Sequence, residues 1–262
     1  MAVRAPLPAN PLASVDAVLA RMTELLTEFE RNGDPRAVFL RSYRIITTRV
    51  RDQVATTHFT DAVWLAALDV EFARAYFDAL EGYEAGRPIP RCWQLAFDLA
   101  KAGRTSVIAD LMLGMNAHIF HDLPIAVFRL GLGQQGRDVR QKDYTLVDEL
   151  LALKIDEVQT AICRHYSFAL WLLDRAGHAT DELFTDRGLR AARALGWQNA
   201  VRLIDAPNDA VRQPVLLELD TLACAAGAPF QSGPLAEPNW FTRMSRRLDR
   251  QLARWFWPKP DS

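Results

Sequence analysis

The chain has 262 residues, of which 50% are hydrophobic and 24% charged, a composition typical of a soluble globular protein with a buried core. Its net charge of −1 gives no electrostatic basis for binding nucleic acid. The cysteines Cys92, Cys163 and Cys224 lie far apart, which argues against disulfides or a cysteine zinc site and favours a cytoplasmic location. We expect neither a secretory signal nor a membrane span.

Helical periodicity runs through almost every segment in chain order, and alternating β-branched runs are absent. The first helices are predicted over residues 13–31, 35–56 and 61–82, with Thr60 as a candidate N-cap. Pro90 begins the next helix, Gly103 ends it, and Thr105 or Ser106 begins a long apolar helix. Pro124 lies inside that helix and should kink or break it, because proline removes an amide and clashes with the preceding turn.

The second half of the chain continues the helical pattern. Helices are predicted within residues 143–177, 181–205 and 214–227, separated by loops that contain glycine. We therefore predict an all-α fold, a single-domain helical bundle of about nine helices, in which residues 1–232 form the all-α helical domain. Residues 233–262 should form a linker rich in proline and glycine, followed by a basic amphipathic helix docked on the bundle.

The predicted C-terminal helix, residues 239–257, carries an apolar stripe that includes Trp240 and Trp255 and a face rich in arginine. Three interpretations fit this pattern. The helix packs on the bundle through its aromatic stripe, it lies on a membrane surface as a peripheral anchor, or it forms a homodimer contact. The sequence leaves these alternatives open.

The stretch NAHIFHDLP, residues 116–124, places several polar groups inside an apolar run that reads as a buried helix. His118 and Asp122 are four residues apart and share a helix face, which His121 can join. Asn116 points elsewhere. Because an unpaired buried polar group costs about 1–3 kcal/mol, the cluster must meet polar groups from other helices, a metal or water.

Three interpretations of this cluster compete. In the first, His118 and Asp122 bind one divalent metal, zinc, iron or manganese, because mixed nitrogen and oxygen ligands suit these ions. In the second, Asp122 orients His118 for metal-free acid–base chemistry. In the third, the cluster is a buried hydrogen-bond network that fixes helix register. The candidate partners in a metal site are His58, Asp61, Asp143, Glu157 and His165.

A sharper variant is the His-Asp phosphohydrolase pattern, which needs an upstream His, a contiguous His-Asp pair and a downstream Asp. His58, the pair His121–Asp122, and Asp143 or Asp148 occur in that order. Short patterns of this kind also arise by chance.

Five segments in order carry a family resemblance: VEFARAYFDAL (70–80), IPRCW (89–93), LGMNAHIFHDLP (113–124), KDYTLVDELL (142–151) and AARALGWQNA (191–200). Over about residues 35–205 the chain resembles a bacterial domain-of-unknown-function family with the hallmark Leu-Gly-x-Asn-Ala-His-Ile-x-x-Asp-Leu. The resemblance implies Asn116, His118 and Asp122 as the main site residues. It implies secondary roles for Asp61, Tyr76, Asp143, Arg193 and Trp197. His121 is not part of the hallmark, which favours the His118/Asp122 pair.

The function expected from these patterns is a metal-dependent enzyme, a hydrolase acting on a small apolar or ester-type substrate. Its candidate catalytic residues are His118, Asp122, Asn116 and Arg193, the last through an anionic part of the substrate. One alternative is a metal-free acid–base enzyme or cyclase of specialised metabolism with His118 as the base. Another is a non-catalytic module that binds a ligand, a partner or a membrane.

Overall fold

The computed structural model describes residues 11–54, 59–103, 105–133, 136–152, 155–166 and 186–232. Its elements are α1 (Pro11–Asn32), α2 (Ala37–Val54), α3 (Ala62–Glu84), α4 (Arg91–Ala102), α5 (Val107–Asn116), η1 (Ala117–Asp122), α6 (Leu123–Leu130), α7 (Arg137–Ala152), α8 (Ile155–Tyr166), α10 (Asp186–Asp205) and α11 (Asp209–Ser232). Because α5, η1 and α6 form one continuous helix, the described residues form nine helices and no strand. The prediction of an all-α bundle of about nine helices is confirmed.

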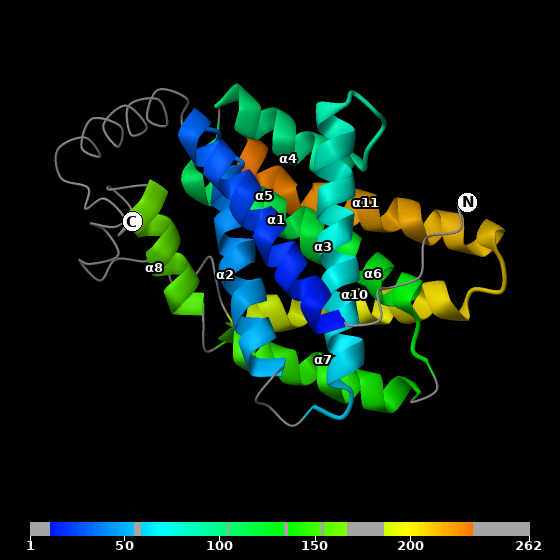
Figure 1. Ribbon diagram of the computed structural model, residues 1–262. Helices are drawn as coiled ribbons and strands as arrows, with labels where there is room; N and C mark the ends of the chain where they lie inside the picture. The colour runs from blue at the N-terminus through cyan, green and yellow to red at the C-terminus, as the bar shows by residue number, and fades with distance from the viewer. Residues whose placement is uncertain are drawn as a thin grey trace.

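The continuous helix α5–η1–α6 occupies the middle of the bundle. Helices α2, α3 and α4 pack against it, and α10 and α11 pack against its η1 and flanking turns. Helix α1 lies across α2 and α3 and covers them from outside (Figure 1). Residues of η1 therefore meet side chains from both halves of the chain, and the polar cluster of NAHIFHDLP lies where these helices converge.

Local sequence signals explain most of the helix boundaries near the centre. Gly103 ends α4 in the left-handed conformation (φ 60°), and the Ser106 side chain caps α5 by accepting from the amide of Ala109. The predicted cap at Thr60 is wrong by one residue. Asp61 is the N-cap of α3, and its side chain accepts from the amide of Trp64.

The sequence predicted that Pro124 would kink or break the central helix, and the structure shows no break at this position. The helix widens into the π-helical segment η1 directly before the proline, and the Leu123 amide donates to the carbonyl of His118. In a regular α-helix the proline ring would clash with the carbonyl of Phe120. The wider turn relieves that clash and lets the helix continue to Leu130. Single π turns inside helices often occur at functional sites.

The central helix is also the one described segment that is long and apolar enough to cross a membrane. Within Val107–Leu130, a window of 18 residues has a mean hydropathy of 1.2, and 67% of that window is buried inside the bundle. A core helix surrounded by other helices has the same composition. The predicted C-terminal helix, with its proposed membrane or dimer contact, lies outside the described residues.

Candidate functional site

The carboxylate of Asp122 is fully occupied by hydrogen bonds inside the bundle. Its Oδ2 accepts from Trp93 Nε1 of α4 at 2.9 Å and is 2.9 Å from His118 Nδ1. Its Oδ1 is 2.7 Å from His121 Nδ1. Burial raises the pKa of Asp122, but the hydrogen bonds from the two histidines outweigh it and hold the pKa below its usual range. Asp122 is therefore an ionised acceptor for three donors.

The contact with Asp122 fixes the protonation of the His118 ring. Because an ionised carboxylate can only accept, Nδ1 of His118 must carry the hydrogen and Nε2 must carry the lone pair. The side chain is buried, and burial lowers the pKa of His118 more than the contact with Asp122 raises it. The imidazole is thus neutral near pH 7. Among the described residues, no group hydrogen-bonds to its Nε2.

Aromatic rings from three helices surround the His118 imidazole. Phe72 stacks on it with the ring centroids 3.5 Å apart and the planes at 6°, and Tyr43 lies with its centroid at 4.3 Å. Phe39, Tyr76 and Trp93 approach edge-on, with centroids between 5.6 and 6.4 Å away.

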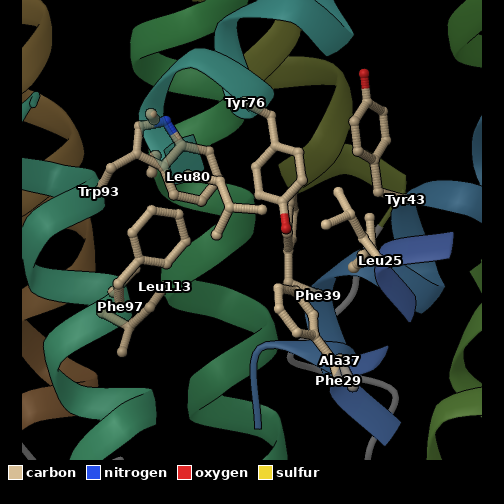
Figure 2. Close-up of a cluster of buried hydrophobic side chains, with 14 of the residues drawn as sticks. Leu25, Phe29, Ala37, Phe39, Tyr43, Tyr76, Leu80, Trp93, Phe97 and Leu113 are labelled. Carbon is tan, nitrogen blue, oxygen red and sulfur yellow. The ribbon is translucent and has the colours of Figure 1, made fainter. Parts of the chain in front are cut away.

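Four of these rings, those of Phe39, Tyr43, Tyr76 and Trp93, lie together in the buried cluster of Figure 2. Tyr76 lies there between Trp93 on one side and Phe39 and Tyr43 on the other, with centroid distances of 5.3, 5.4 and 6.2 Å. Phe72 thus covers one face of the histidine, and the other rings make T-shaped contacts with it.

Several polar atoms around this aromatic cluster are buried without a hydrogen-bond partner in the described part of the chain. Besides Nε2 of His118, they include Oη of Tyr76, Oδ2 of Asp69 and Nδ2 of Asn116. A folded protein rarely leaves such atoms unpaired, because each costs about 1–3 kcal/mol. Nε2 of His118 and Oη of Tyr76 both belong to rings of the aromatic cluster.

Three residues that build this site were not predicted from the sequence as site residues. Trp93 binds Asp122, Tyr43 faces His118, and Asp69 carries one of the unpaired atoms. A signal for Asp69 was present, since it is the lone carboxylate within the apolar stretch WLAALDV. Tyr76, which the family resemblance implied as a secondary residue, does lie in the aromatic cluster.

Asp61 and Asp143, predicted as metal ligands, form a separate structural cluster. Asp143 accepts from the amides of Thr60 and Asp61 at 2.9 and 2.7 Å. Asp61 caps α3 and forms an ion pair with Arg140 at 2.6 Å. Both carboxylates hold the turn before α3 in place, and the structure does not bring them to His118 and Asp122.

The described residues offer no convergent set of metal ligands. No three side chains of His, Cys, Asp or Glu in this part of the chain come together in a way that could hold an ion. His165 contacts the carbonyl of Ala161 through Nδ1. His58 lies outside the described residues, as does the side chain of Glu157, so neither the complete predicted ligand set nor the phosphohydrolase pattern is tested.

Arg193 of α10 is held by Asp148 and Tyr144 of α7. Its Nε donates to Asp148, its Nη2 donates to the carbonyl of Tyr144 at 3.3 Å, and its guanidinium lies 4.5 Å from the Tyr144 ring centroid. Burial raises the pKa of Asp69, and the positive charge of Arg193 opposes this shift. Trp197 packs on Tyr144 at 5.1 Å.

Comparison with known proteins places the whole helical bundle within one family. No curated protein and no solved structure matches the chain. A family described as a family of unknown function, DUF5995, matches residues 15–230, which includes every helix of the site. The chain therefore belongs to the family DUF5995, as the resemblance to a domain-of-unknown-function family indicated.

Proposed function

We propose that the chain is an acid–base enzyme in which His118 is the general base and Asp122 its positioning residue. The observation that carries this proposal is the difference between the two nitrogens of the His118 imidazole. Nδ1 contacts an ionised, fully hydrogen-bonded carboxylate, and Nε2 is a neutral, unpaired acceptor. A carboxylate behind a histidine fixes its tautomer and stabilises the imidazolium that forms when Nε2 takes a proton.

The reaction that we expect is hydrolysis of a small, largely apolar ester. Nε2 of His118 would remove a proton from water as the water oxygen attacks the ester carbonyl. The lowered pKa of His118 keeps the ring in its basic form at neutral pH. The hallmark stretch with Asn116, His118 and Asp122 is consistent with this assignment, because the structure places Asn116 one residue before η1, with its Nδ2 unpaired.

The aromatic environment indicates the substrate class. Rings of Phe39, Tyr43 and Phe72 adjoin the imidazole, and they favour an apolar acyl or alkyl group over a charged one. His118 is 3% exposed, so a substrate reaches Nε2 only when these side chains move aside. Phe72 is the partly exposed member of this group, which makes it the side chain expected to move.

A metal-dependent hydrolase is the competing proposal. A histidine backed by a carboxylate is also the usual arrangement of a zinc ligand. The donor set supports it less, because a catalytic zinc needs about three protein ligands and no three side chains of His, Cys, Asp or Glu converge in the described part of the chain. Activity that persists in a strong chelator would separate the two proposals in favour of the metal-free one.

The test uses para-nitrophenyl acetate, butyrate and octanoate with the full-length protein and its His118→Gln variant. Losing a general base lowers the rate by about 10²–10⁴-fold, so we expect a loss in this range. His165→Gln is the matched control, because His165 lies on α8 and contacts the carbonyl of Ala161 rather than the cluster. Circular dichroism of each variant checks that it folds.

Two results would contradict the proposal. One is hydrolysis no faster than in buffer with the wild-type protein, and the other is equal activity in wild type and folded His118→Gln. If His118→Gln does not fold, Asp122→Asn replaces it, since that change keeps the shape of the side chain and removes its charge. If a chelator abolishes the activity of the wild-type protein and added zinc restores it, the metal-dependent enzyme would be supported instead.

A further inference from the structure

The site holds a second ionisable side chain that the proposed base does not use, Asp69 of α3. The residue as a whole is partly exposed, but its Oδ2 is buried and makes no hydrogen bond within the described residues. A buried, unpaired carboxylate oxygen is costly in a fold, and more costly when it is charged. Packing alone therefore does not explain why a carboxylate occupies this position.

The helix face that carries Asp69 is the face that covers His118. Asp69, Phe72 and Tyr76 follow one another at three- and four-residue intervals, so they share one side of α3. Phe72 stacks on the imidazole at 3.5 Å, and the Tyr76 ring lies 6.4 Å from it. Asp69 thus lies one turn along the same face from the ring that touches the proposed base.

Tyr43 of α2 links Asp69 to the histidine. Its ring centroid is 4.3 Å from that of His118, and its hydroxyl is buried. Burial raises the pKa of the Tyr43 phenol, and the negative charges of Asp69 and Asp122 raise it further. The Tyr43 phenol therefore lies within electrostatic range of both carboxylates.

We propose that Asp69 is the proton donor of this site and that it acts on the leaving group while His118 acts on water. This inference rests on the proposed function. In the balanced step, water adds to the ester carbonyl and loses a proton to Nε2 of His118. The bond from the carbonyl carbon to the alkoxy oxygen then breaks, and that oxygen takes the proton of Asp69. The products are a carboxylic acid and an alcohol.

The electrostatics around Asp69 suit a donor. Burial raises its pKa to about 7, although the charge of Arg193 on α10 opposes the shift. A fraction of the carboxyl groups thus keeps its proton near neutral pH while the His118 ring stays unprotonated. The two groups are shifted in opposite directions, as in enzymes that pair an acid with a base. The partial exposure of Asp69 lets it exchange protons with solvent after each turnover.

The experiment compares two esters of one acid, a para-nitrophenyl ester and an ethyl ester, in wild type and Asp69→Asn. A good leaving group such as nitrophenolate departs without a proton, whereas an alkoxide needs one. We expect Asp69→Asn to lower kcat/KM for the ethyl ester by about 100-fold or more and for the nitrophenyl ester by less than about 10-fold. Asp78→Asn, an exposed carboxylate on the same helix, is the control and should change neither rate.

The pH profile provides a readout that a purely structural role would not change. Wild-type activity on the ethyl ester should fall as the pH rises past about 7, because Asp69 loses its proton, and Asp69→Asn should lack this fall. Equal losses on both esters, or an unchanged profile, would overturn the inference. If His118→Gln is inactive and Asp69→Asn is fully active, the proposed base stands and the donor fails. If both variants are fully active, both proposals fail.

Discussion

Replacing Asp69 with asparagine should stabilise the protein at alkaline pH, because the wild-type carboxylate is buried without a partner. The pKa of Asp69 is raised from 3.8 to about 7 in the folded state. Between these values the folded protein binds more protons than the unfolded chain. Stability therefore falls as the pH rises through this window, and the cost is complete above the folded pKa. Asparagine has nearly the same shape and cannot ionise, so it removes this cost.

The magnitude follows from the width of the window. One pKa unit corresponds to about 1.36 kcal/mol, so two units between about pH 5 and 7 give an upper limit of about 2.7 kcal/mol. Solvent reaches part of Asp69 and screens its charge, which lowers the expected change to about 1–2 kcal/mol. The advantage of Asp69→Asn over wild type should grow by this amount between about pH 5 and 8.

Urea unfolding followed by circular dichroism at these two pH values measures the change. The exposed Asp78→Asn variant should differ from wild type by no more than about 0.5 kcal/mol at either pH. If the stability difference between Asp69→Asn and wild type is the same at both pH values, Asp69 titrates like an exposed aspartate. The assignment of a protonated Asp69 near neutral pH would then be wrong.

Three further predictions address the neighbouring residues. Asp122→Asn should destabilise the protein by about 2–4 kcal/mol and lower Tm by roughly 5–12 °C in calorimetry, because Trp93 and His118 lose a charged acceptor. Burial lowers the pKa of His118, so below about pH 6.5 the unfolded chain binds a proton at this residue more readily than the folded protein does. The free energy of unfolding should therefore fall with decreasing pH, and urea unfolding should show a smaller fall in His118→Gln. Gly114→Ala should cost about 1–3 kcal/mol by urea unfolding, because its methyl group would lie 2.5 Å from Cγ of Phe39; a gain in stability, as helix propensity alone favours, would contradict this packing.

The fold was predictable from the sequence because its signals are local. Gly103 and Ser106 end and begin helices through side-chain and backbone preferences that act within a few residues. The effect of Pro124 was not predictable in the same way. A proline inside an apolar helix can break it, kink it or follow a widened turn, and the helices packed on η1 from both sides favour the last of these.

The sequence predicted the local contacts of the site but not the contacts between residues far apart in the chain. The contact between His118 and Asp122 is set by their four-residue spacing, and the structure shows it at 2.9 Å. Asp61 and Asp143 were predicted as metal ligands from their acidic side chains alone. The amides of Thr60 and Asp61, which donate to Asp143 in the structure, are more than 80 residues from it in sequence and could not be predicted. Trp93 reaches Asp122 from a helix 29 residues away in sequence, which no periodicity reveals.

The arrangement of paired and unpaired atoms argues for chemistry rather than for helix register. A network that serves only register is most stable when each member is satisfied. Here the carboxylate of Asp122 is satisfied by three donors, whereas Nε2 at the other end of the His118 imidazole has no partner among the described residues. Apolar side chains of similar volume at these positions would avoid that cost. The fold therefore spends stability at the end of His118 where a substrate would receive or give a proton.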